Sequence, residues 1–477
     1  MARFAAWPAV ASAAVLTACA APPYKVPQVA AALPPAYKEV GPWTPAAPAD
    51  EAAHGAWWTA FNDPQLDQLE GRLAAANPDL AQAVARYDQA RAFLAQARAG
   101  FFPTVSLDGS ADRSRQSISR PNGNGRSVQG DDFTLGAAVS YEPDLWGRVR
   151  NTVAAGAAEA QASAADLAAT RLSLQAELAD TYLSLRSLDA QARVLDAAVV
   201  NYAKALDLTQ ARHRGGVVSG VDVGQAETQL NTARAARSEV AAQRALLEHA
   251  AASLVGEPAS RFSIAVADQL PQLPATPVSA PSILLQRRPD VAAAERRAFA
   301  ANRRIGVARV AFFPDVALSA TGGFETTHLH QSLLTTPNSF WSLGADAALA
   351  IFDGGQRAAG VRAAKAGFEE AAGAYRTTVL AAFQEVEDNL ALLNHLAQEA
   401  EQQQAALDAA RRTEDLALTR YKQGAATYLD AVQAQTSALD AERAVVGLQA
   451  RRLQASVDLI RALGGGWMAP ERPAPNA

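Results

Sequence analysis

The chain of 477 residues contains a single cysteine, Cys19, which excludes a disulfide bond within the chain. It has no excess of positive charge: the formal net charge is −5, so the composition gives no reason to expect a nucleic-acid partner. After the first 18 residues no run of about 18 apolar residues occurs, which argues against a transmembrane helix in the remainder. Motifs for a phosphate-binding loop, a nucleophile elbow or a metal-binding helix are also missing. His328 and His330 form a pair with no third ligand. We therefore predict no enzyme, no cofactor and no metal site.

The N-terminus carries the features of an exported protein. Residues 1–18 combine Arg3 with an apolar run and small residues, which predicts a signal peptide. This segment runs into Leu-Thr-Ala-Cys, which resembles the bacterial lipobox, whose cysteine is acylated and becomes the mature N-terminus. The alternative is that Cys19 is a small buried hydrophobic residue. Its place before a stretch rich in Pro and Ala favours lipidation, and we interpret 19–62 as a lipidated tether.

The rest of the sequence is one unit in two copies. Phe-Phe-Pro occurs at 101–103 and again at 312–314, an offset of 211, and further motif pairs recur at offsets of 208 to 211. We place the first copy at 63–270, a Pro-rich linker at 271–281, the second copy at 282–467 and a tail at 468–477. Because the motifs recur, we predict the same series of helices and strands in each copy.

Hydrophobic periodicity defines these elements. Alternation of apolar and polar residues predicts strands at about 103–113, 133–142, 315–325 and 340–351, the first of them preceded by one helix at about 63–100. Long Ala-rich helices are predicted at about 146–213 and 355–422, with the 4-3 apolar spacing of coiled coils. Returning helices are predicted at about 220–254 and 428–463.

The strands have features of membrane strands, although alternation alone fits a soluble core equally well. They have about ten residues, enough to cross a bilayer when tilted, and the loops within each pair are long and polar. Aromatic residues at the strand ends are typical of an interfacial girdle: Phe101, Phe102, Phe133, Tyr141, Trp341 and Phe352. Unpaired edges are not tolerated in lipid and the smallest barrels have about eight strands, so at least two chains must share one barrel.

Several motifs, in order along nearly the whole chain, resemble the TolC-type outer-membrane efflux family, and most closely its lipidated NodT- and OprM-like branch. The motifs are WWTAFNDPQLDQLE (57–70), NPDL (77–80), the two Phe-Phe-Pro triplets, YEPDLWGR (141–148), FQEVEDNL (383–390) and RYKQGAATYLDAVQAQ (420–435).

The resemblance implies a mainly α protein with a β membrane part. In the implied homotrimer, four strands per chain build a shared 12-stranded outer-membrane β-barrel, and the long helices build a periplasmic α-barrel. It also implies a passive conduit for small molecules such as drugs and toxic compounds. The conduit would work with a periplasmic membrane-fusion adaptor and an inner-membrane RND-type pump, lipid-anchored in the outer membrane and spanning it and the periplasm. A channel for type I protein secretion and a heavy-metal efflux channel remain alternatives.

The resemblance further implies a periplasmic gate at the turns between the long and the returning helices. Its residues would be Asp222, Tyr421, Leu429 and Asp430, with a hydrogen bond from the Tyr421 hydroxyl to Asp222. The alternative is that the two aspartates only favour helix N-termini through the helix dipole. Gln433 and Ala426 depart from the family pattern, which usually has Asp at the first position and in some relatives Arg at the second.

Overall fold

The computed structural model describes residues 21–28, 37–39, 56–119, 126–267, 270–274, 288–328 and 333–465. Cys19, His330 and the predicted signal peptide lie outside these ranges. The chain divides into two compact units. The sheet unit comprises Met1–Pro27, Tyr87–Ser163 and Ala294–Tyr375, and the helical unit comprises Gln28–Arg86, Ala164–Ala293 and Arg376–Ala477. None of the described helices is both long and apolar enough to cross a membrane.

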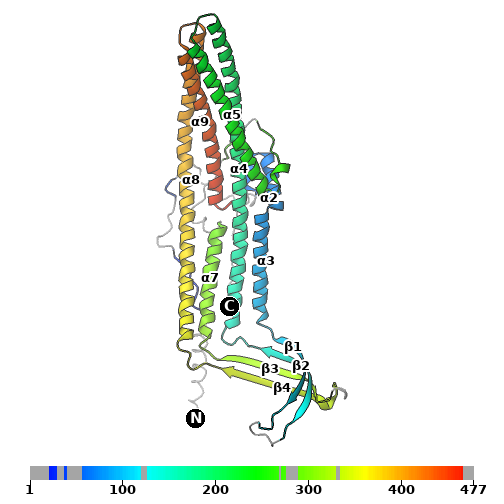
Figure 1. Ribbon diagram of the computed structural model, residues 1–477. Helices are drawn as coiled ribbons and strands as arrows, with labels where there is room; N and C mark the ends of the chain where they lie inside the picture. The colour runs from blue at the N-terminus through cyan, green and yellow to red at the C-terminus, as the bar shows by residue number, and fades with distance from the viewer. Residues whose placement is uncertain are drawn as a thin grey trace, which may run out of the picture. The chain divides into compact units, whose positions relative to one another are not determined.

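Helices make up most of the described chain (Figure 1). They are η1 (Trp57–Phe61), α2 (Pro64–Ala76), α3 (Pro78–Ala99), α4 (Arg148–Arg214), α5 (Gly220–Leu254), η2 (Ala259–Arg261), α7 (Pro289–Val310), η3 (Thr336–Asn338), α8 (Gln356–Lys422) and α9 (Tyr428–Ala462). The strands are β1 (Thr104–Arg115), β2 (Gln129–Tyr141), β3 (Asp315–Thr326) and β4 (Ser339–Ala348). α4 and α8 contain 67 residues each, which corresponds to about 100 Å of α-helix. The predicted class, mainly α with a small β part, is confirmed.

One predicted helix is instead two. Asn77 separates α2 from α3 with an extended backbone (ψ 124°), because a residue before proline disfavours the α conformation. Its side-chain Oδ1 accepts a hydrogen bond from the Leu80 N–H at 2.8 Å and so caps α3. Its Nδ2 donates to the Leu254 carbonyl at 2.8 Å, which ties this break to the end of α5.

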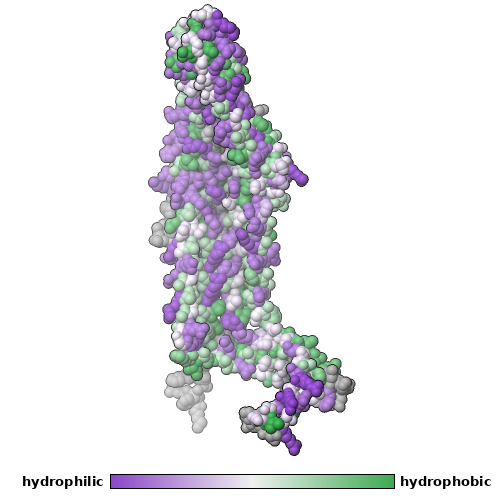
Figure 2. Space-filling model, viewed as in Figure 1, coloured by the Kyte–Doolittle hydropathy of each residue, from purple (hydrophilic) through white to green (hydrophobic). Residues whose placement is uncertain are grey.

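The four strands form one antiparallel sheet in the order β1-β2-β3-β4. The register places apolar residues opposite one another across every pair: Val105 faces Val139, Val139 faces Ala320, and Ala320 faces Leu343. One face of the sheet is therefore apolar over most of the four strands, because side chains alternate with a period of two. Arg113, Arg115 and Asp131 lie on the same face, at the end of β1 and the start of β2. This face is exposed in the single chain, where Leu107 is 77 % exposed. Figure 2 shows apolar surface on the sheet and a hydrophilic patch near the ends of β1 and β2.

The second Phe-Phe-Pro triplet forms a packed junction between α7 and β3. Phe313 stacks on Trp146 with ring centroids 5.1 Å apart, and the Trp146 indole donates a hydrogen bond to the Pro314 carbonyl at 2.8 Å. The Arg357 guanidinium lies 5.4 Å from the Phe312 ring centroid. The triplet thus ends a helix and begins a strand. In the first copy, Phe102 is 71 % exposed.

Apolar residues at the 4-3 spacing of the long helices are buried in the helical unit. Leu178, Leu185 and Leu195 of α4 and Val379 and Val386 of α8 are each 0 % exposed. Each such side chain contributes about 1.5–3 kcal/mol by leaving water. The 4-3 apolar spacing in the sequence therefore marks the buried face of the long helices.

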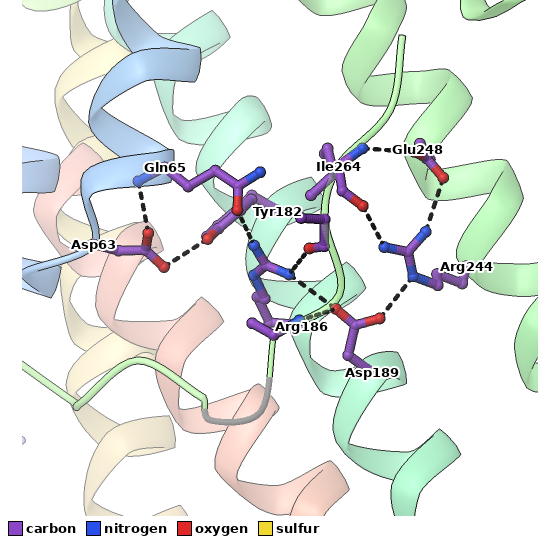
Figure 3. Close-up of polar contacts among 10 residues, drawn as sticks. Asp63, Gln65, Tyr182, Arg186, Asp189, Arg244, Glu248 and Ile264 are labelled. Atoms are coloured by element: carbon purple, nitrogen blue, oxygen red, sulfur yellow. Dashed lines mark hydrogen bonds and ion pairs between the residues drawn. The ribbon is translucent and has the colours of Figure 1, made fainter.

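A buried polar network joins α2, α4, α5 and the segment after η2 (Figure 3). Arg186 of α4 donates to Asp189 at 2.9 Å, to the Ala265 carbonyl at 2.7 Å and to the Gln65 side chain. Its guanidinium also lies over the ring of Tyr182, 4.6 Å from the centroid. The Tyr182 hydroxyl donates to Asp63, the N-cap of α2, at 2.6 Å.

A second arginine completes this network. Arg244 of α5 donates to Asp189 at 2.6 Å, to Glu248 at 2.8 Å and to the Ile264 carbonyl at 2.7 Å. The Asp189 side chain is 1 % exposed and contacts both arginines. Two carboxylates, Asp189 and Glu248, therefore balance two cations that are largely out of water. The segment after η2 is held by hydrogen bonds from these arginines to its main-chain carbonyls.

Glu70 stands out in the apolar stripe of α2. It is buried together with Leu66, Leu69 and Leu73 and is 0 % exposed. Among the described residues neither of its carboxyl oxygens has a hydrogen-bond partner. Burial, with a smaller contribution from Asp67, raises the pKa of Glu70 to about 9. The side chain is therefore a neutral acid at pH 7.

We expect Asp189→Asn to destabilise the protein by about 3–5 kcal/mol, because it leaves the buried Arg186 guanidinium without its carboxylate partner and removes one of the two carboxylates that contact Arg244. The matched control is Asp196→Asn, which removes the exposed Arg237–Asp196 pair and should cost under about 1 kcal/mol. Thermal unfolding followed by circular dichroism measures both. Equal effects of the two variants would contradict the structural role of Asp189.

We expect Glu70→Leu to stabilise the protein by about 1–3 kcal/mol, because it removes a buried polar group without partners. The gain should grow with pH. The unfolded acid titrates near 4.5 and the folded acid near 9, so between these values the folded state binds more protons. Wild-type stability then falls as pH rises through this window.

The test of Glu70 compares melting temperatures at pH 5 and pH 8.5. The difference between Glu70→Leu and wild type should widen at the higher pH. Glu70→Gln keeps a buried polar group but cannot titrate. The difference in melting temperature between Glu70→Gln and Glu70→Leu should therefore be the same at both pH values. A difference between Glu70→Leu and wild type that does not change with pH would show that Glu70 is already ionised in the folded protein.

Candidate functional site

The two turns at the predicted gate have the same geometry. Gly216 follows α4 with φ +72°, and Gly424 follows α8 with φ +76°. The Val217 N–H donates to the Arg212 carbonyl at 2.9 Å, and the Ala425 N–H donates to the Arg420 carbonyl at 2.8 Å. A left-handed glycine with this backfolded hydrogen bond ends a helix and reverses the chain. The duplication is thus preserved in the backbone of both turns.

The two predicted gate acids form capping boxes. Asp222 accepts hydrogen bonds from the Ser219 N–H at 2.9 Å and the Ser219 hydroxyl at 3.0 Å, at the start of α5. Asp430 does the same with Thr427, at 2.9 and 2.7 Å, at the start of α9. These hydrogen bonds from Thr427 lower the pKa of Asp430. Asp430 is exposed and Asp222 is partly exposed, and within one chain both serve as helix N-terminal acids.

The Tyr421 hydroxyl has a partner other than Asp222. Tyr421 is 3 % exposed, and its hydroxyl lies 3.1 Å from the Thr209 hydroxyl. The ring packs edge-on against Tyr428 at 5.3 Å, in a small cluster with Ala226 and Ala431. The prediction of a Tyr421–Asp222 hydrogen bond is therefore wrong within one chain, because Asp222 is already held by its own helix cap.

Arg212, which the sequence did not single out, ties the two turns together. Its guanidinium lies 4.7 Å from the Tyr421 ring centroid. It donates to the Tyr421 carbonyl at 2.8 Å and to the Lys422 carbonyl at 2.7 Å, both at the end of α8, where carbonyls have no partner in their own helix. The aligned motifs RHRGG and RYKQG place Arg212 and Arg420 at equivalent positions. This repeated arginine was the signal that could have revealed the tie.

Leu429, the remaining residue of the predicted gate, is 48 % exposed. Next to it, a groove of about 720 Å³ lies between α8 and α9, and its lining includes Arg420, Ala426, Asp430 and Gln433. The two positions that depart from the family pattern, Ala426 and Gln433, therefore share one groove with a predicted gate acid.

Most predicted girdle residues lie at or near strand ends, but Phe133 lies inside β2, because this strand begins four residues earlier, at Gln129. Phe133 and Tyr141 lie on the apolar face of β2, opposite Thr326 and Leu318. Trp341 of β4 is 78 % exposed and Phe352, beyond its end, is 90 % exposed. Phe101 and Phe102 directly precede β1. A role at the membrane interface stays a prediction.

No group of three or more His, Cys, Asp or Glu that could hold a metal ion occurs in the described part of the chain.

Comparison with known proteins decides the family. Residues 69–257 and 280–465 match the family described as outer membrane efflux protein. The chain belongs to this family. The two matched stretches fall on the two copies of the repeated unit.

Relatives of this outer membrane efflux protein are similar over most of their length. The chain is 34% identical over 428 residues to the pyoverdine export outer membrane protein OpmQ of Pseudomonas aeruginosa, covering 87% of this chain and 88% of that protein. It is 32% identical over 456 residues to the probable efflux pump outer membrane protein TtgC of Pseudomonas putida, covering 94% and 92%.

Solved channels share the fold. The outer-membrane channel OprN superposes with a TM-score of 0.88 at 29% identity, covering 94% of this chain and 99% of that chain. The open state of the Neisseria gonorrhoeae MtrE outer-membrane channel superposes with a TM-score of 0.80 at 27% identity, covering 95% and 100%. The outer membrane efflux protein described here is thus an outer-membrane component of an efflux pump, as predicted.

Proposed function

We propose that this outer membrane efflux protein works as a homotrimer that forms one passive conduit. Four strands from each chain would complete a 12-stranded barrel in the outer membrane, and the long helices would line a periplasmic tunnel. The observation that carries this proposal is the single sheet with its edges at β1 and β4 and one continuous apolar face. In lipid, backbone groups at such edges need partners, so the edges must meet further copies of the chain.

The conduit would receive its cargo from an inner-membrane RND-type pump through a periplasmic membrane-fusion adaptor. The name of TtgC, an efflux pump outer membrane protein, supports this assembly. The cargo would be small molecules, because relatives are named for export of pyoverdine and for efflux of antibiotics and toluene. These names favour small molecules over secreted proteins or heavy metals.

A lipid anchor at Cys19 fits the path of the chain that follows it. Tyr24 packs edge-on against Phe299 of α7 at 5.0 Å, and its hydroxyl lies 3.3 Å from the Glu295 carbonyl. A Cβ added at Gly306 would come within 2.8 Å of the Ala21 Cβ, so the small residue makes room for the chain just after Cys19. Because α7 leads directly into the junction with β3, these contacts support a lipid close to the strands.

The gate would lie at the turns that contain Gly216 and Gly424. Three chains would bring three copies of Asp222 and Asp430 toward one axis, where like charges repel unless they are hydrated or bind cations. Rings of Leu429 would add an apolar constriction, and such constrictions exclude water. Tyr421 would act through the buried contacts with Thr209 and Arg212 that hold α8 to α4.

We expect native mass spectrometry in detergent to give three copies of the mature chain with acyl groups attached. Cys19→Ser should lose the acyl mass and remain trimeric, because the sheet edges and not the lipid drive assembly. A wild-type monomer that keeps its β signal in circular dichroism would contradict the trimer. Acyl mass retained in Cys19→Ser would contradict lipidation at this residue.

We expect Tyr421→Phe combined with Asp430→Ala to raise single-channel conductance in planar bilayers. Loss of the Tyr421–Thr209 hydrogen bond should shift the equilibrium toward the open state by about 2–10-fold, since one such bond contributes about 0.5–1.5 kcal/mol. Arg212→Ala should act in the same direction, because it removes the hydrogen bonds from α4 to the carbonyls at the end of α8.

The control for the gate is Asp408→Ala, which removes an exposed acid of α8 outside the turns and should keep wild-type conductance. Admission of vancomycin into cells gives a second readout. Unchanged conductance in the double variant and in Arg212→Ala would place the gate elsewhere in the channel.

A further inference from the structure

We propose that β4 of one chain pairs antiparallel with β1 of the next in a defined register. In this register Trp341 lies opposite the partner's Arg115, Ala345 opposite the partner's Ala111, and Leu349 opposite the partner's Leu107. The inference rests on the proposed homotrimer and adds to it the residues that meet at each seam between chains. It follows from the internal duplication and from the register observed inside one chain.

The two hairpins show which strand residues are equivalent in the two copies. The Phe-Phe-Pro triplets relate β1 to β3 by 211 positions, so Val105 corresponds to Val316. Val105 faces Val139 in the first hairpin, and Val316 faces Ala347 in the second. Val139 therefore corresponds to Ala347, and β2 is related to β4 by 208 positions. The junction after the strands has an offset of 209 (Asp144 and Asp353), so the second copy holds one extra residue beyond β4.

The register is taken from the pairing of β2 with β3, where the two copies meet inside the chain and which we call the internal seam. β2 ends the first copy of the sheet and β3 begins the second, and their pairing runs from Phe133 opposite Thr326 to Tyr141 opposite Leu318. In a closed ring of alternating copies, β4 of one chain meets β1 of the next in the same way. Moving Phe133 by 208 positions gives Trp341, and moving Thr326 back by 211 gives Arg115.

The transferred register agrees with the two faces of the sheet. Ala345 and Ala347 of β4 belong to the apolar face, and so do Ala111 and Gly109 of β1, which would lie opposite them. A slip by one residue would place the apolar residues of β4 opposite polar ones of β1, since side chains alternate between faces. The apolar face then continues across the seam at Ala345, Ala347 and Leu349, whereas Leu343 and Trp341 lie opposite the partner's Arg113 and the partner's Arg115.

One contact at this seam has no counterpart inside the chain. Trp341 is 78 % exposed in the single chain, and the register sets it opposite the partner's Arg115 and diagonal to the partner's Arg113. Arg113 and Arg115 lie on the same face of β1 as Leu107, and Arg113 also pairs with Asp131 at 3.4 Å. A guanidinium over an indole ring is a favourable contact. At the internal seam the equivalent residues are Phe133 and Thr326, which cannot form it.

The two seams must differ in spacing at one point. Inside the chain Gly136 faces Gly323, and a Cβ on Gly323 would come within 2.4 Å of the Leu135 carbonyl oxygen. The position equivalent to Gly323 is Asp112, which has a Cβ. The backbones of β4 and the partner's β1 therefore lie farther apart there, beside Gly344.

Disulfide cross-linking tests the register directly. The chain has only one cysteine, so Cys19→Ser gives a background free of thiols. Ala345→Cys with Ala111→Cys in this background should give covalent dimers and trimers on a non-reducing denaturing gel after oxidation. A bond within one chain is excluded, because two strands separate these positions. Three strand spacings of about 4.8 Å give about 14 Å, and a disulfide needs Cα atoms about 4.4–6.8 Å apart.

Matched variants control for geometry and folding. Ala137→Cys with Gly322→Cys is the equivalent pair at the internal seam and should form a disulfide within one chain, without covalent oligomers. Gly109→Cys or Arg113→Cys combined with Ala345→Cys shifts the pair by two residues on the same face and should cross-link less. Trp341→Cys with Arg115→Cys tests the same register at the other end of the strands if the first pair fails to fold.

The outcomes separate the register from the assembly. Strongest cross-linking at Gly109→Cys or Arg113→Cys would overturn the register and leave the trimer intact. No cross-linking by any pair, in a protein that is trimeric by native mass spectrometry, would show that β4 and β1 do not meet. A monomeric wild-type protein would instead overturn the homotrimer on which the inference rests.

Discussion

The need to pair backbone hydrogen-bonding groups shapes this protein more than any single side chain does. The sheet of each chain has two edges, at β1 and β4, and an apolar face that runs across all four strands. In water such edges invite uncontrolled pairing, and in lipid each unpaired group costs several kcal/mol. The duplication answers this constraint, because a unit that already pairs with a copy of itself inside one chain can pair with a further copy in the same manner.

The two copies share the backbone geometry of their turns and differ in the side chains there. Gly216 and Gly424 have the same left-handed geometry. The position of Tyr421, however, is taken by His213 in the first copy, and that ring contacts the Val218 carbonyl at 3.0 Å at the surface. The aromatic side chain is thus buried only at the second turn, where Arg212 from the end of α4 contacts it.

The buried network around Asp189 fixes how the helices pack and has no part in the proposed gate. It joins elements that are far apart in sequence, and its two arginines each contact side chains and main-chain carbonyls. Charged groups out of water are costly unless fully paired, so such a network specifies one arrangement of the helices and tolerates no partial loss. Glu70 in the neighbouring apolar stripe shows the opposite case, a buried acid without partners that stays neutral.

The sequence by itself determined the class of fold, the duplication and the family. These depend on periodic signals: alternation marks the strands, the 4-3 spacing marks the long helices, and repeated Phe-Phe-Pro and turn motifs mark the two copies. The resemblance to the efflux family also pointed to the acids at the turns, Asp222 and Asp430, whose helix caps are local features of the chain. Only the tertiary structure decided that Asn77 splits a helix by bonding to the end of α5 and that Tyr421 turns toward Thr209. Only it showed that Arg212 reaches the end of α8 and that Asp189 lies between two arginines. Each of these contacts joins residues that are distant in sequence, except where Arg186 and Asp189 share a helix face. Periodicity reports which face of an element is buried, and it carries no information on which polar partner arrives there from another element.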